Sequence, residues 1–194
     1  MNLIYYPAAC SLADHIALIE SGLPYKLLSI DRDKKTEDGR DFLAINPKGY
    51  VPALEMDDGT VLTENQVILA YIADQSGKLL PDDHILRWRT FEVLAFMSSE
   101  IHGAYGPFFR DFPEPEKMRA RDKINKAFAI LAGQMGNKAF LISNEMTIAD
   151  CYLFWILMVA PRSGVDLPDT LRDCLERMKA RPSVIQALAE EGLS

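Results

Sequence analysis

The pattern of secondary structure changes once along this chain, at about residue 77, and this change limits the folds available to it. Before it, short runs of strand-type residues alternate with stretches of helical spacing in the order βαβαββα. After it, every long segment has helical spacing. We therefore expect an α/β domain over residues 1–77, a linker over residues 78–83 and an all-helical domain over residues 84–194. The predicted strands are residues 3–6, 25–30, 50–56 and 60–62, and the predicted helices are residues 12–21, 41–45, 63–76, 84–109, 114–135, 147–160, 168–179 and 182–191.

Three sites in the sequence carry helix-start signals. Thr63 with Gln66, and Thr147 with Asp150, have the form of a capping box, and Asp83 precedes a further helix as a cap. The helix after Thr147 is nearly all apolar, which predicts a helix buried on most of its sides.

Cys10 stands where an apolar strand becomes a helix. Pro7 ends the strand, and Ser11 is expected to cap the helix that follows, so Cys10 would lie beside unpaired backbone N–H groups. Such a setting favours the thiolate and a reactive cysteine. A cysteine beside an apolar strand is also commonly a small buried hydrophobe, and position alone leaves both interpretations open.

The net charge of the chain and the spacing of its cysteines and histidines argue against several kinds of binding partner and site. The formal net charge of −7 disfavours binding to nucleic acid or to an anionic membrane, and the apolar run 151–160 is about half the length of a membrane helix. Cys10, Cys151 and Cys174 are an odd, scattered set, which predicts a reducing cytoplasm and no disulfide framework. Three scattered histidines add no spacing typical of a metal site.

Several motifs resemble those of one enzyme family. Val51-Pro52 before a strand, Glu64 at the start of the next helix and the Thr147–Asp150 box resemble the glutathione S-transferases. The bacterial beta class is indicated by the segments Tyr6–Ser11, Asn46–Gly49, Ser98–His102, Arg181–Val184 and Glu191–Leu193. The resemblance covers essentially the whole chain. It implies a thioredoxin-like first domain, a helical second domain, a role in detoxification, and a homodimer whose interface comes from residues 84–109 and 114–135.

The resemblance also implies roles in glutathione binding. The backbone of Val51, before a cis Pro52, would pair with the cysteinyl part of glutathione like an added strand. Glu64 would bind the γ-glutamyl ammonium, and the helix N-terminus with Asn65 would bind the adjoining carboxylate. Lys34 would meet the glycyl carboxylate, with adjacent Lys35 as a substitute.

The same resemblance implies catalytic and pocket residues. Cys10 would lie near the glutathione sulfur, able to form a mixed disulfide with it, while Ser11 and Tyr5 remain alternative donors to that sulfur. His102 would line the same cleft as a donor or base. An apolar co-substrate pocket would be walled by Tyr105, Phe108 and Phe109. Two positions depart from the family pattern, since Ala95 and Gly103 stand where relatives often carry Asn and Lys.

Three functions follow as hypotheses. The first is transfer of the glutathione thiolate to apolar electrophiles, without a metal. The second is glutathione-dependent thiol-disulfide exchange or peroxidase chemistry at Cys10, which would need external glutathione because Ala13 replaces the second cysteine of a C-x-x-C motif. The third is a carrier that binds apolar ligands without turnover.

Overall fold

The computed structural model describes residues 1–110 and 112–193, and it divides into two compact units. The sheet unit comprises Met1–Leu79 together with Arg181–Ser194, and the helical unit comprises Leu80–Ala180. Residues 111 and 194 of the predicted helical domain lie outside the described residues. Among the described residues, no helix combines the length and the apolar content needed to cross a membrane.

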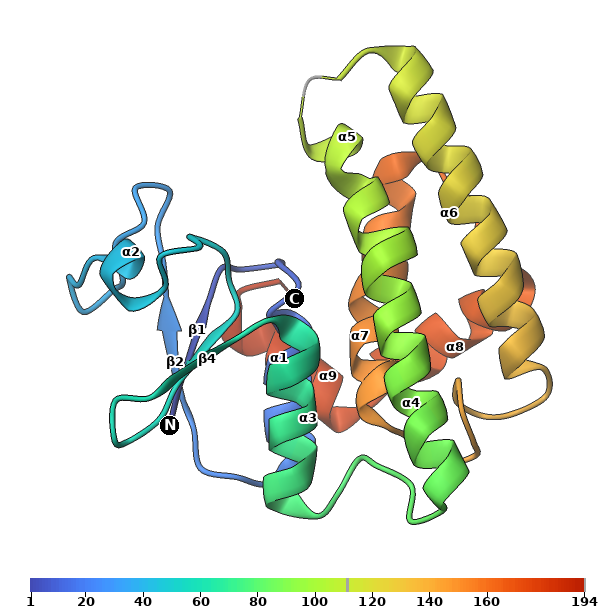
Figure 1. The fold of residues 1–194 in the computed structure, drawn as a ribbon. Helices are drawn as coiled ribbons and strands as arrows, with labels where there is room; N and C mark the ends of the chain where they lie inside the picture. The colour runs from blue at the N-terminus through green and yellow to red at the C-terminus, as the bar shows by residue number, and fades with distance from the viewer. Residues whose placement is uncertain (111, 194) are drawn as a thin grey trace. The chain divides into compact units, whose positions relative to one another are not determined.

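The sheet unit has the predicted order of elements, a four-stranded mixed sheet with helices (Figure 1). Its strands lie in the order β2-β1-β3-β4, with β1 parallel to β2 and the other two pairings antiparallel. A buried cluster of Ile4, Leu28, Ile30, Phe42 and Ala53 fills one part of its core. The elements are β1 (Asn2–Tyr5), α1 (Leu12–Ser21), β2 (Lys26–Ser29), α2 (Phe42–Ile45), β3 (Ala53–Glu55), β4 (Val61–Thr63) and α3 (Asn65–Ser76).

Helices α1 and α3 pack against each other through their apolar positions. Leu12 and Ile16 of α1 and Ile68 and Ile72 of α3 are fully buried, at the spacing of a single helix face. This packing brings the start of α3 close to the start of α1, where Cys10 precedes the helix.

The last helix, α9 (Pro182–Glu190), also packs against α1. Arg181 adds an ion pair, with its Nη2 2.7 Å from Oε1 of Glu20. Residues 181–193 therefore belong with the sheet unit, whereas the sequence pattern placed them in the domain 84–194. Helical spacing identifies the buried face of α9 but contains no information about which core covers it.

The helical unit contains the long helices α4 (His84–Phe96), α6 (Glu114–Met135), α7 (Ile148–Val159) and α8 (Asp169–Lys179). The single helix predicted over residues 84–109 is interrupted. After α4 the chain forms a π-helical turn, η1 (Met97–His102), a 3₁₀ turn, η2 (Gly103–Tyr105), and the short helix α5 (Gly106–Phe109). Pro107 explains the 3₁₀ turn of this interruption, because a proline cannot donate to the carbonyl four residues before it, that of Gly103, and its ring clashes with that carbonyl. A further 3₁₀ turn, η3 (Ala160–Ser163), follows α7.

Two of the predicted helix starts are confirmed and one is wrong. Oδ1 of Asp83 accepts from the Leu86 N–H at 2.8 Å, and both halves of the Thr147–Asp150 capping box are present. Thr63 is instead the last residue of β4, and Glu64 occupies the cap position of α3 without a side-chain cap bond. The strand pairing of Thr63 with Ala53 therefore takes precedence over the local capping pattern.

Candidate functional site

Cys10 lies in the loop between β1 and α1. Its side chain is 9% exposed, and its Sγ is 3.6 Å from the carbonyl oxygen of Val51. The loop is tightly turned, because Ala8 adopts a left-handed φ of 63° and the Ala9 N–H donates to the Tyr6 carbonyl at 3.0 Å. The thiol therefore lies beside the edge residue that the resemblance assigns to glutathione.

Burial decides the protonation state of Cys10. It raises the pKa of the thiol to about 12, and the buried Asp14 adds to the rise. The N–H groups of Cys10 and Ser11 lower the pKa but do not offset the burial. The expectation that this helix start favours the thiolate is thus wrong for the ligand-free protein. At neutral pH Cys10 is a protonated thiol, which can donate a hydrogen bond.

Slow alkylation of Cys10 is expected as a consequence. With a pKa of about 12, we expect iodoacetamide at neutral pH to modify Cys10 at least about 100-fold more slowly than it modifies free glutathione, because the thiolate is the nucleophile. Peptide mapping after timed quenching measures the rate. Equal rates for Cys10 and free glutathione would show that the thiol is ionised after all.

Ser11 and Tyr5, the alternative donors, are both largely buried. Ser11 is fully buried, and its Oγ donates to the Tyr6 carbonyl at 3.4 Å. It makes no cap bond to α1, so its predicted capping role is wrong. Tyr5 is 8% exposed, and burial together with Glu191 raises the pKa of its hydroxyl. Both groups are neutral donors at physiological pH.

Asn65 faces the interior of the sheet unit and makes two hydrogen bonds there. Its Nδ2 donates to the Cys10 carbonyl at 2.9 Å and to Oδ2 of Asp14 at 2.8 Å. The side-chain amide of Asn65 thus bonds to groups inside the protein, which corrects the expectation that it would bind a carboxylate of the ligand. Oδ1 of Asn65 and Oδ1 of Asp14 are buried without a partner among the described residues, and burial raises the pKa of Asp14 well above its usual value. Asn65 fixes the Cys10 loop to the start of α3.

Removal of the Asn65 amide should therefore weaken the fold. We expect Asn65→Ala to lower the free energy of unfolding by about 1–3 kcal/mol, because it leaves the buried Asp14 carboxyl without a side-chain donor and removes one of the two donors to the Cys10 carbonyl. Urea denaturation followed by far-UV circular dichroism measures the loss. Val67→Ala is the matched control, since Val67 lies on the same helix and is 49% exposed. A loss no larger than that of the control would contradict this role.

Val51 and Glu64 have the local geometry expected of a binding edge. The Val51–Pro52 peptide bond is cis. Glu64 has a left-handed φ of 72°, which is uncommon outside glycine and is typical of functional sites. The N–H groups of Asn65 and Gln66 in the first turn of α3 have no acceptor among the described residues, as expected at a helix N-terminus.

Lysines pair with the acceptors of this region. Nζ of Lys48 is 2.6 Å from Oε1 of Glu64 and 2.9 Å from Oγ1 of Thr63. Lys34 has a left-handed φ of 60°, and its Nζ donates to the Gly49 carbonyl at 2.9 Å. Lys35 is exposed, and its Nζ is 3.8 Å from Oδ2 of Asp41. Lys34 therefore reaches the turn before Val51, and Lys48 already holds the carboxylate of Glu64.

A buried histidine of α1, outside the predicted site residues, supports the Cys10 loop. His15 has no exposed surface; its Nδ1 is 3.1 Å from Oε1 of Glu191 and its Nε2 is 2.8 Å from Oε2 of Glu190. Oε2 of Glu191 also accepts from the Ala8 N–H at 3.0 Å. The sequence pattern does not predict that these carboxylates meet His15, because the contacts span more than 170 positions of the chain.

His102, the remaining predicted catalytic residue, belongs to an aromatic cluster of the helical unit. Its Nδ1 is 2.6 Å from the Tyr152 hydroxyl, and its ring centroid is 4.5 Å from that of Trp155. Burial lowers the pKa of His102, so its imidazole is neutral at physiological pH. A neutral imidazole can accept a proton, which a base requires.

The three predicted pocket residues differ in exposure. Tyr105 is fully buried and donates to the Ile156 carbonyl at 2.9 Å, so it belongs to the core of the helical unit, which corrects its assignment to a pocket wall. Phe109 is 53% exposed, and the Phe108 ring has the Arg121 guanidinium 5.5 Å from its centroid. Of the three, only Phe108 and Phe109 remain candidates for the wall of a co-substrate pocket.

The chain matches two family models in succession. Residues 9–75 match the model of the glutathione S-transferase N-terminal domain, and residues 95–182 match the model of its C-terminal domain. A curated relative, glutathione S-transferase GstA of Escherichia coli O157:H7, is 40% identical over 200 residues, with both chains fully covered.

Solved structures agree with these matches. The bacterial beta class glutathione S-transferase of Sphingomonas chungbukensis is 39% identical, with a TM-score of 0.92 over 100% of both chains. A sphingomonad glutathione S-transferase complexed with glutathione is 38% identical, with a TM-score of 0.93 and the same coverage.

Proposed function

The chain belongs to the glutathione S-transferase family, and on that premise we propose that it transfers the thiolate of glutathione to apolar electrophiles. One observation carries the proposal. The protonated Cys10 thiol, the Val51 carbonyl and the free N–H groups at the start of α3 lie together in the sheet unit. They supply a donor for a sulfur, an edge for a peptide backbone and a site for a carboxylate.

Glutathione fits this set of groups from end to end. Its γ-glutamyl ammonium would pair with Glu64 in place of Lys48, and its α-carboxylate would accept from the N–H groups of Asn65 and Gln66. Its cysteinyl amide would bind the backbone of Val51, and its glycyl carboxylate would meet Lys34.

The chemical step follows from the protonation states. We propose that the bound glutathione thiol gives its proton to solvent or to the neutral His102 imidazole, and that the Cys10 S–H, with Ser11 and Tyr5 as alternatives, donates to the resulting thiolate. The thiolate then forms an S–C bond to the electrophile as the leaving group departs with its electron pair. In this proposal His102 is the neutral base or donor from the helical unit, and Phe108 and Phe109 contact the apolar co-substrate.

Turnover of 1-chloro-2,4-dinitrobenzene with glutathione tests this function. We expect a rate well above the uncatalysed one, with release of chloride and formation of the thioether. Binding of glutathione without any acceleration would favour the carrier, and no binding at all would contradict the proposal.

A mixed disulfide at Cys10 is the second reaction we propose to test. Its thiolate would attack oxidised glutathione, forming one S–S bond while one glutathione thiolate leaves. Burial opposes this ionisation in the ligand-free protein. Mass spectrometry after incubation with oxidised glutathione is expected to show an adduct on Cys10 and none on the buried Cys151 or Cys174. The absence of any adduct would leave Cys10 only the donor role.

We also propose that the protein is a homodimer whose interface comes from α4 and α6. Four large apolar side chains on these helices, Ile85, Trp88, Met118 and Ile130, are each more than half exposed in the single chain. Sedimentation at micromolar concentration is expected to give the mass of two chains. A charged substitution such as Trp88→Glu should shift the measured mass to that of one chain. A monomeric parent protein would contradict the proposal. The free thiols of Cys10 and Cys174 further favour a reducing compartment such as the cytoplasm.

A further inference from the structure

Lys34 lies at the tip of a loop that is closed by its own backbone. Residues Ile30 and Thr36 face each other as an antiparallel bridge, as do Lys35 and Asp41, and the Phe42 N–H donates to the Lys34 carbonyl at 2.9 Å. The position of Lys34 therefore depends on where the residues up to Asp41 are held.

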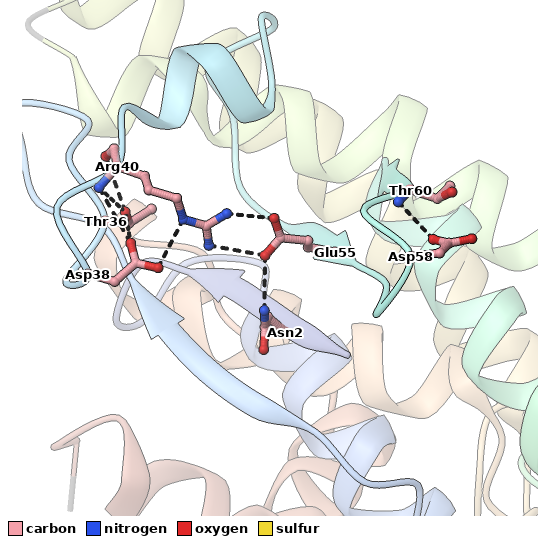
Figure 2. A network of polar contacts seen from close by, with 7 residues as sticks. All are labelled: Asn2, Thr36, Asp38, Arg40, Glu55, Asp58 and Thr60. Carbon is pink, nitrogen blue, oxygen red and sulfur yellow. Dashed lines mark hydrogen bonds and ion pairs between the residues drawn. The ribbon is translucent and has the colours of Figure 1, made fainter.

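One arginine holds this loop to the sheet. Figure 2 shows the guanidinium of Arg40 between the carboxylates of Asp38 and Glu55, with Asn2 bonded to the Glu55 carboxylate from below. Nη1 and Nη2 of Arg40 donate to Oε1 and Oε2 of Glu55 at 2.6 and 3.0 Å, and Nε donates to Oδ2 of Asp38 at 2.9 Å. We call Asn2, Thr36, Asp38, Arg40 and Glu55 the Arg40 cluster.

The cluster joins the loop to two strands. Glu55 is the last residue of β3, its side chain is 15% exposed, and its Oε2 also accepts from Nδ2 of Asn2 in β1 at 2.9 Å. On the loop side, the Arg40 N–H donates to Oγ1 of Thr36 at 2.9 Å, and Thr36 is almost fully buried. Only a planar guanidinium can donate to both carboxylate oxygens of Glu55 and to Asp38 at the same time.

Resting on the proposed function, we propose that Arg40 is a positioning residue for Lys34 and thereby sets the affinity of the site for the glycyl carboxylate of glutathione. Arg40 does not act by attracting the anion itself, because two carboxylates surround its single charge and the cluster carries a net negative charge. Its contribution is geometric, and the bidentate pair with Glu55 is the feature that a lysine cannot reproduce.

The test compares steady-state KM and kcat of three variants with the parent protein. Arg40→Lys keeps the charge and loses the fork, and Glu55→Gln keeps Arg40 and loses one carboxylate. Arg89→Lys is the control for the loss of an arginine ion pair elsewhere, because Nη1 of Arg89 binds both carboxylate oxygens of Glu92 and both side chains are more than half exposed in the single chain. Thermal unfolding of each variant confirms that it is folded.

We expect Arg40→Lys and Glu55→Gln to raise KM for glutathione by about 3- to 10-fold with kcat unchanged. The increase is modest because the charge-assisted bonds that are lost are partly exposed to solvent. Arg89→Lys should leave both constants unchanged. With glutathione esterified at its glycyl carboxylate, Arg40→Lys and the parent should have equal KM values, since Lys34 has no anion to meet.

Three results would overturn the inference. An unchanged KM in Arg40→Lys removes the positioning role. A lower KM in Glu55→Gln indicates that net charge, and not geometry, controls binding. A defect of Arg40→Lys that persists with the ester shows that the loop acts elsewhere. A parent protein that turns over no glutathione contradicts the proposed function itself, which is a separate outcome.

Discussion

Asp150→Ala is expected to lower the free energy of unfolding by about 3 kcal/mol at neutral pH, because each buried donor left unsatisfied costs about 1–3 kcal/mol. The carboxylate is fully buried and accepts from the N–H groups of Leu141 and Thr147, both at 2.8 Å, and from Oγ1 of Thr147 at 3.0 Å. The substitution also removes a buried charge, and this offsets part of the loss of stability. Since native domains are stable by only about 5–15 kcal/mol, the change is large.

The size of this effect should depend on pH with a definite sign. Burial raises the pKa of Asp150 to about 6, despite its three hydrogen bonds. Between the unfolded value and this one, the folded protein binds the proton more tightly, so the stability that Asp150 contributes falls as pH rises through that window. The decrease in the free energy of unfolding caused by Asp150→Ala should therefore be about 1 kcal/mol larger at about pH 5 than at about pH 7.

Urea titrations of the parent and variant at both pH values measure these differences. Thr147→Ser is the control, because it keeps the capping hydroxyl and should cost less than about 1 kcal/mol. A loss in Asp150→Ala that matches the control, or that grows towards neutral pH, would contradict the account.

Glu64→Gln is expected to raise KM for glutathione by roughly 10- to 100-fold, with kcat at saturation little changed. A hydrogen bond to a charged group contributes about 1.5–3 kcal/mol, and about 1.4 kcal/mol corresponds to a factor of ten. The carboxylate is the proposed partner of the γ-glutamyl ammonium, and its left-handed backbone places it at the start of α3. Initial rates over a range of glutathione concentrations give both constants.

Lys48→Met is the matched control for that experiment. Nζ of Lys48 is bound to Glu64 in the ligand-free protein, so its removal takes away a competing cation. Its KM should be equal to that of the parent or lower. An unchanged KM in Glu64→Gln would place the ammonium elsewhere.

Elements with strong periodicity were predictable from the sequence, and so was their order. The alternation of short strands and helices predicted the α/β half, and the Thr147–Asp150 box marked the start of the buried helix α7 to the residue. Local rules failed where tertiary pairing competed with them. Thr63 extends β4 and cannot cap α3, while Ser11 bonds the Tyr6 carbonyl and leaves the start of α1 uncapped.

Side-chain direction was the other limit of prediction. Asn65 follows Glu64 at the expected place, but its amide faces Cys10 and Asp14, because α1 packs against α3. Tyr105 is an aromatic residue of the type expected in a pocket wall, but it is fully buried and its hydroxyl donates to the Ile156 carbonyl. Periodicity specifies a face of an element, and the neighbouring elements decide which groups meet there.

The return of α9 to the sheet unit has a consequence for how the protein is made. A ribosome synthesises Glu190 and Glu191 after the whole helical unit, yet their carboxylates bind His15 and the Ala8 N–H beside Cys10. The helical unit is continuous in sequence and can fold as it is made, whereas the Cys10 loop, made before it, must wait for α9, made after it. The Cys10 loop is thus completed only after the helical unit has been synthesised, and a chain truncated at Ala180 would leave that loop without its anchor.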